Sequence, residues 1–168
     1  MLSKKVEKIL VEQILKEGYS SNLYLAMASW AEVKGYAGVS QWFYAQSNEE
    51  RMHMLKLITY VNERGGTAII PAFEKPPVDF GTVLQVFEKV LSHEQFVTQS
   101  INEIVAVCIE EKDYTTQNWI QWFVTEQIEE EASVQAILDK LNLVGDQNLY
   151  LFDRDIMTMR GSAGGTAE

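Results

Sequence analysis

A carboxylate and an imidazole occupy positions of this chain where a helix would be expected to bury apolar side chains. In the segment NEERMHML, Glu50 and His53 are three residues apart and share a line with Phe43 and Leu57. Residues spaced three or four apart lie on one face of a helix, and this line is otherwise apolar. A single Glu-x-x-His pair is common by chance. Such a pair on a buried face can nevertheless bind a metal ion.

Three other predicted helices interrupt their apolar line in the same way, with a carboxylate or an amide near mid-length. The interrupting residues of the four helices are Glu17, Glu50, His53, Glu94, Gln127 and Glu130. In an antiparallel bundle of helices of similar length, the midpoints meet at one level. We therefore expect these six side chains to converge inside the bundle.

Four convergent glutamates require neutralisation, because the apolar lines contain no lysine or arginine. An unpaired buried carboxylate costs several kcal/mol. Protonation with strongly raised pKa values is one solution, and a pair of divalent cations is a better one. Oxygen ligands with one imidazole suit iron or manganese, with zinc as a tight, redox-inert alternative, whereas calcium has little use for a histidine. A lone glutamate usually reaches solvent at a rim, but the coincidence on four helices favours metal binding.

The acidic run EQIEEE raises a second possibility beside this group. Glu126 and Glu129 are three residues apart and flank the line of Gln127 and Glu130, as Glu49 flanks Glu50. Consecutive acids usually form a solvated helix face. The spacing alone leaves that interpretation and an additional cation site equally open.

Helix-breaking and helix-capping residues define the ends of the helices that must position these side chains. All three prolines, Pro71, Pro76 and Pro77, lie in one window that no helix can cross. Asp113 is suited to cap a helix that follows it, and the Arg64–Gly65–Gly66 stretch is suited to end one. The predicted helices span residues 3–33, 39–64, 82–111, 114–142 and, for a shorter one, a region between 146 and 159.

The connections between these helices predict the topology. The first two helices and the next two are joined by short connections, which favour antiparallel hairpins. The hairpins are joined by roughly 16 residues that include the prolines, long enough to let the second and third helices run parallel. The sequence thus predicts an all-α four-helix bundle with one long crossover and a short fifth helix.

Composition narrows the function further. The chain has 168 residues, enough for one domain, and a net charge of −10, which argues against nucleic acid as a partner. Its single cysteine, Cys108, excludes an intrachain disulfide and multi-cysteine metal sites. We expect no membrane span and no signal peptide, and hence a cytoplasmic protein. The domain is expected to cover residues 1–160, with a flexible tail at 161–168.

Over nearly its full length the chain resembles the bacterial non-haem ferritins. The matching motifs are EQILKEGYSSNLYLAMASW, SNEERMHM, LSHEQFVTQSINE and QWFVTEQIEEE. The order of Glu, Glu-x-x-His, Glu and Gln-x-x-Glu across four helices makes the resemblance specific. It implies a ferritin-like bundle with a di-iron ferroxidase centre, in which Fe(II) is oxidised by O2 or H2O2.

The resemblance also implies roles for individual residues. Glu17, Glu50 and His53 match the first iron site, with Glu50 bridging to a second site. Glu94 and Gln127 match the second-site positions, with Glu130 nearby. The third iron site of the family is matched by Glu49, Glu126, Glu129 and Glu130. Tyr24 matches a tyrosine near the centre, which either bonds a ligand, supplies an electron or only packs. Trp122 matches a nearby aromatic residue and is interpreted as packing.

Two related families fit less well. Bacterioferritin-like chains carry a second Glu-x-x-His and bind haem through a methionine directly after the glutamate of the second helix, where this chain has Arg51. Met52 is turned by about 100° from that position, so no haem is expected. Rubrerythrin-like chains need a cysteine-rich domain. Gly18 departs from the family pattern, and a mid-helix glycine costs about 1 kcal/mol relative to alanine.

The resemblance implies storage of a ferric mineral inside a hollow shell of about 24 identical chains, with the short fifth helix at its four-fold axes. One alternative is a di-iron oxidase or peroxide scavenger that stores nothing. Another is a helical bundle whose acids hold a fixed zinc ion.

Overall fold

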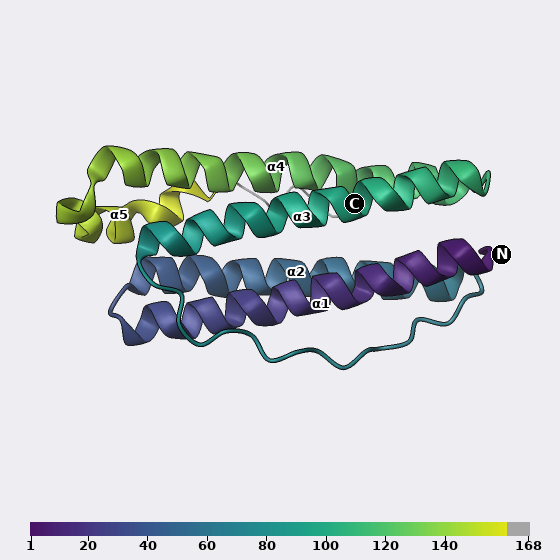
Figure 1. The fold of residues 1–168 in the computed structure, drawn as a ribbon, viewed down its shortest axis with the longest axis horizontal. Helices are drawn as coiled ribbons and strands as arrows, with labels where there is room; N and C mark the ends of the chain where they lie inside the picture. The colour runs from purple at the N-terminus through teal and green to yellow at the C-terminus, as the bar shows by residue number, and fades with distance from the viewer. Residues whose placement is uncertain (161–168) are drawn as a thin grey trace.

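The computed structural model describes residues 1–160, apart from the side chain of Asp146, as a bundle of four long helices with a short fifth helix at one end (Figure 1). The residues described contain no β-strand, and none of their helices is long and apolar enough to cross a membrane. The helices are α1 (Lys4–Val33), α2 (Ala37–Glu63), α3 (Val83–Glu110), α4 (Tyr114–Val144) and α5 (Leu149–Asp155).

Side-chain caps fix where three of the long helices begin. The Ser3 hydroxyl accepts from the Val6 N–H at 3.2 Å, and Thr82 forms a reciprocal capping box with Gln85. Asp113 accepts from the Thr116 N–H at 3.0 Å, which confirms the predicted cap of α4. These bonds satisfy amide groups that the first helical turn leaves without partners.

The second helix begins two residues earlier than predicted because α5 supports its first turn. The N-cap residue Tyr36 contributes no side-chain bond, and the Asp153 carboxylate of α5 accepts from the Val39 N–H at 2.9 Å instead. A Cβ at Gly38 would lie 1.8 Å from the Asp153 carbonyl oxygen. Gly38 is therefore a point of close contact between α2 and α5.

The long connection between α2 and α3 runs the length of the bundle beside the α1–α2 hairpin (Figure 1). It brings the start of α3 to the end of the bundle where α2 starts, so α2 and α3 run parallel. The α1–α2 and α3–α4 pairs are antiparallel hairpins. The predicted architecture is confirmed.

The core consists of two apolar clusters at opposite ends of the bundle. The first cluster includes Tyr24, Phe43 and Phe87 together with Phe152 of α5. The second cluster includes Leu10, Leu57, Ile101 and Phe123. In every long helix the predicted polar interruption lies between the segments that form the two clusters. The interior is thus divided by a polar layer at mid-length.

The region predicted as one short C-terminal helix is three short pieces. A 3₁₀ turn at Asp146–Asn148 precedes α5, and a second one spans Ile156–Met159. Phe152 and Ile156 are buried in the apolar cluster at that end. The predicted tail, 161–168, lies outside the described residues.

Candidate metal centre

The six side chains predicted to converge are all buried in the polar layer, each between 1% and 7% exposed. They come from all four long helices and are Glu17, Glu50, His53, Glu94, Gln127 and Glu130. The register of the helices sets this convergence, because each helix reaches the layer near its midpoint. The layer divides into a half from the α1–α2 hairpin and a half from α3–α4.

The α1–α2 half contains carboxylate oxygens without hydrogen-bond partners. The Oε2 atoms of Glu17 and Glu50 are buried and have no hydrogen-bond partner among the residues that the structure describes. The Nδ1 atom of His53 lies 3.6 Å from Glu50 Oε2 and 4.0 Å from Glu17 Oε2. The other oxygen of Glu17 accepts from Gln13 Nε2 at 2.8 Å, and the Ser100 hydroxyl donates to Gln13 Oε1 at 2.8 Å.

The α3–α4 half is held by hydrogen bonds. The Tyr24 hydroxyl donates to Glu94 Oε1, and the Gln127 amide donates to Glu94 Oε2 at 3.2 Å. Glu130 Oε2 accepts from the Gln46 amide at 2.7 Å. Each of these two carboxylates therefore has a neutral donor that fixes its orientation.

The electrostatic field of the layer disfavours negative charge. Burial, followed by repulsion from Glu94, Glu17 and Glu130, raises the pKa of Glu50 well above its ordinary value. Burial raises the pKa of Glu94 to about 7, although the bonds from Tyr24 and Gln127 act in the opposite direction. Burial and the charge of Glu94 also raise the pKa of Glu130 well above its usual range. The layer must therefore bind protons or other cations near neutral pH.

The donor set fits a metal ion. One oxygen each from Glu17 and Glu50 and one nitrogen of His53 lie within 4.8 Å of one another. Buried polar atoms normally have partners, and here two carboxylate oxygens without any face an imidazole. Carboxylate and imidazole ligands suit iron, manganese or zinc.

A second group of potential ligands adjoins the first and shares its histidine. Ligand atoms of Glu49, His53 and Glu126 also lie within 4.8 Å of one another. Partial burial raises the pKa of Glu126, and Glu129 and Glu49 add repulsion. The exposed Glu129 does not belong to this group of three.

Aromatic rings pack against the other side of the His53 imidazole. Among the described residues, no group forms a hydrogen bond with it. The rings of Trp122 and Phe123 lie edge-on to the imidazole, with centroids 5.4 and 5.8 Å away. The Lys56 ammonium lies 4.0 Å from the centroid of Trp122. Packing therefore restrains the imidazole, which agrees with the interpretation of Trp122 as a packing residue.

Three residues of the site were missed by sequence reasoning. Gln13 and Gln46 stand four positions before Glu17 and Glu50, one helical turn away, and that spacing could have identified both as supports. Arg160, whose guanidinium pairs with Glu49, gave no signal, because it follows the last helix and its position depends on how that segment folds back.

The unexplained Gly18 has a packing reason. A Cβ there would lie 2.4 Å from Phe73 Cε1 and 2.9 Å from Met54 Sδ. The glycine makes room for the Phe73 ring of the crossover where it passes α1, one residue from Glu17. The crossover is thereby anchored beside the α1–α2 half of the layer.

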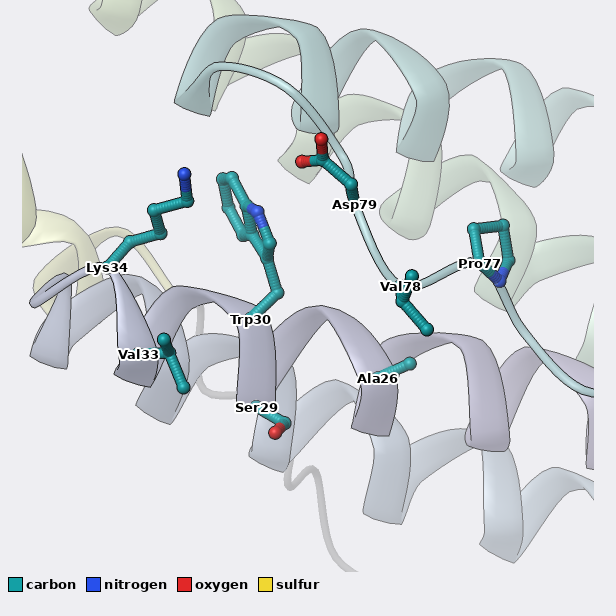
Figure 2. Close-up of a pocket in the computed structure, with 8 residues that line it drawn as sticks. All are labelled: Ala26, Ser29, Trp30, Val33, Lys34, Pro77, Val78 and Asp79. Atoms are coloured by element: carbon teal, nitrogen blue, oxygen red, sulfur yellow. The ribbon is translucent and has the colours of Figure 1, made fainter.

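An open surface hollow of about 420 Å³ lies elsewhere, between the C-terminal half of α1 and the crossover (Figure 2). Trp30, Lys34 and Asp79 line it with mostly small or apolar neighbours. None of the candidate ligands contributes to it.

The chain is similar in sequence to known proteins over most of its length. The model of the ferritin-like domain matches residues 7–144. A bacterial non-heme ferritin of Campylobacter jejuni is 46% identical over 93% of this chain and 95% of its own length. A probable bacterial non-heme ferritin-like protein of Haemophilus influenzae is 44% identical over 93% and 96%.

Solved structures agree with the sequence relatives. A structure described as an open pore ferritin from the archaeon Archaeoglobus fulgidus superimposes with a TM-score of 0.91, at 42% identity, over 93% of this chain and 98% of that one. The resemblance drawn from the four helical motifs is confirmed. The chain therefore belongs to the ferritin family.

Proposed function

We propose that this protein stores iron and oxidises Fe(II) to Fe(III) at the buried polar layer. The observation that carries the proposal is the pair of unpartnered, buried oxygens of Glu17 and Glu50 beside His53 Nδ1. Such atoms are costly to bury unless a cation satisfies them. Fe(II) is the substrate in this proposal, and the ligands that hold it are side chains of the four helices.

The two halves of the layer take different roles. Glu17 and His53 hold one ion, and Glu50, which the charges of Glu94 and Glu130 influence from the other half, bridges to a second. Glu94 holds that second ion, with Gln127 and Glu130 beside it. Protons leave Glu50 and Glu94 when cations arrive, because a metal replaces the charge that the protons supplied.

When bound, the Fe(II) ions supply electrons to O2 or H2O2. The carboxylate-rich set favours the harder ferric ion, which promotes oxidation. Tyr24 holds Glu94 in one orientation through its hydroxyl. Glu49 and Glu126 supply oxygens for a further ion next to His53.

Storage requires a closed assembly of many copies, and the ferritin relatives support one for this chain. We propose a homo-oligomeric cage of about 24 chains with the ferric mineral inside. The acidic balance of the chain, −10, attracts cations to such a shell.

Iron retained per chain tests the proposal. Metal-free protein receives excess Fe(II) in air and passes through a sizing column, and iron is counted in the protein peak. Many ions per chain in a large assembly support storage. A plateau of two or three per chain would instead favour an oxidase or peroxide scavenger, and no retained iron would contradict the proposal.

Glu50→Ala tests the site itself. Because Glu50 faces both halves, its loss should reduce rapid Fe(II) oxidation by at least ~100-fold. The matched control is Glu12→Ala, which removes an exposed glutamate of α1. Oxidation at the rate of the control would overturn the assignment.

A further inference from the structure

The C-terminal segment places a cation against the candidate centre. After α5, the buried Ile156 anchors the last 3₁₀ turn in the apolar cluster, and Arg160 follows it. The Arg160 guanidinium pairs with the Glu49 carboxylate and donates to Gln46 Oε1 at 3.1 Å. It also donates to the Trp42 carbonyl at 3.4 Å and lies 5.8 Å from the centroid of that ring.

These contacts reach the outer group of potential ligands and, through Gln46, the α3–α4 half of the buried layer. Glu49 belongs to the outer group, with His53 and Glu126. Gln46, whose oxygen accepts from Arg160, donates through its nitrogen to Glu130 Oε2 at 2.7 Å. One side chain from outside the bundle thus holds an outer ligand directly and a buried carboxylate through an amide.

The guanidinium occupies the place of a counter-ion. Only 18% of the Arg160 side chain and 18% of the Glu49 side chain are exposed. Among the described residues, no other arginine or lysine forms an ion pair with a candidate ligand. A charge-assisted bond to a carboxylate is about twice as strong as a neutral one, so an ion that binds Glu49 must compete with Arg160.

We propose that Arg160 is a tethered counter-cation that holds Glu49 and Gln46 until a metal ion displaces it. The C-terminal segment then sets the affinity of the outer group and keeps it weaker than the inner one. Arg160 is a positioning residue, since it acts through Glu49 and Gln46. The inference rests on the proposed function, because it requires that both groups bind metal.

Calorimetric titration of the metal-free, full-length assembly with Zn²⁺ tests the inference without any redox step. In the unsubstituted protein we expect tight inner sites and one weaker outer site per chain. Arg160→Gln should strengthen the outer site about tenfold, because the metal no longer displaces a guanidinium. Arg154→Gln is the matched control, since it removes the same charge, and within residues 1–160 Arg154 forms an ion pair only with Asp155.

Two further variants make the result specific. Glu49→Gln should abolish the outer site, and the effect of Arg160→Gln should vanish in that background. Arg160→Lys keeps the charge without the planar fork and should strengthen the site about threefold, which gives a reading even if the glutamine variant fails to assemble.

The inference is overturned if Arg160 and Arg154 variants bind Zn²⁺ alike at the outer site, or if Arg160→Gln weakens it. Failure of the proposed function has a different signature. In that case the unsubstituted protein would lack the tight inner sites, and Glu50→Ala would leave the titration unchanged.

Discussion

The two halves of the buried layer solve the same electrostatic problem in different ways. In the α3–α4 half, the carboxylates accept hydrogen bonds from neutral donors. Glu94 accepts from Tyr24 and Gln127, and Glu130 accepts from Gln46. In the α1–α2 half, Glu17 and Glu50 each keep one buried oxygen without a partner. Hydrogen bonds make a carboxylate tolerable in the metal-free protein, whereas an unpartnered oxygen is satisfied only by a proton or a metal ion.

This difference teaches which half governs metal binding. In the α1–α2 half, the unpartnered oxygens of Glu17 and Glu50 lie close to the His53 imidazole. An ion can therefore bind there with little loss of existing hydrogen bonds. In the α3–α4 half an ion must replace or rearrange existing bonds. We therefore expect the first ion to bind at Glu17, Glu50 and His53.

The largest effect expected from this comparison is an asymmetry between His53→Ala and Gln127→Ala. Loss of the imidazole removes a proposed ligand of the first ion and should weaken tight Zn²⁺ binding by at least ~100-fold, whereas loss of the amide should cost about tenfold. Calorimetric titration measures both. Equal losses would contradict the division into two unequal halves.

The pH dependence of the metal-free protein should reveal the cost of the layer. The folded-state pKa of Glu94, about 7, exceeds the ordinary value of 4.5 for a glutamate, so the folded state binds more protons than the unfolded state between those values. Stability therefore falls as pH rises from about 4.5 to 7, by roughly 3 kcal/mol for this group alone. Glu50 and Glu130 act in the same direction.

The melting temperature at fixed protein concentration checks this dependence. It should fall from pH 5 to 7.5 in the metal-free protein and fall less in Glu94→Gln. With saturating Zn²⁺ the trend should reverse, because ionised ligands bind the metal better. A melting temperature that rises with pH in the metal-free protein would refute the prediction.

Tyr24→Phe should make the α3–α4 half resemble the α1–α2 half. The bond from the Tyr24 hydroxyl lowers the pKa of Glu94, so its removal raises that pKa further. We expect a destabilisation of about 1–2 kcal/mol at pH 8, where the bond involves a carboxylate, and a smaller one at pH 5. Equal changes in melting temperature at both pH values would indicate only lost packing.

Gly18→Ala should have the smallest net effect, at the point where the crossover meets the α1–α2 half. Alanine favours the helix by about 1 kcal/mol but displaces Phe73, whose ring lies 2.4 Å from the added Cβ. In a Phe73→Ala background only the flexible Met54 side chain, whose sulfur lies 2.9 Å from the added Cβ, still has to shift. Gly18→Ala should then stabilise the protein by up to about 1 kcal/mol. A double-mutant cycle on melting temperatures measures this coupling.

Much of the fold was predictable because the signals are local. The periodicity of apolar residues, the proline cluster and the Asp113 cap placed the four long helices within two residues of their observed ends. The early start of α2 was not predictable, because the stabilising carboxylate comes from Asp153, more than a hundred residues away. The C-terminal pieces were also missed as separate turns, since short segments are shaped by the surface on which they pack.

The sequence by itself determined that the six interrupting side chains meet in one layer, because a polar interruption near the middle of each helix and similar helix lengths leave a single level for convergence. It also determined the need for neutralising cations, since buried carboxylates without basic partners on their own helices repel one another. Only the tertiary structure decided how that charge is divided. The partners of Glu94, Glu130 and Glu49 reach the layer from other elements, and hydrogen bonds between distant segments depend on distances that no local pattern encodes.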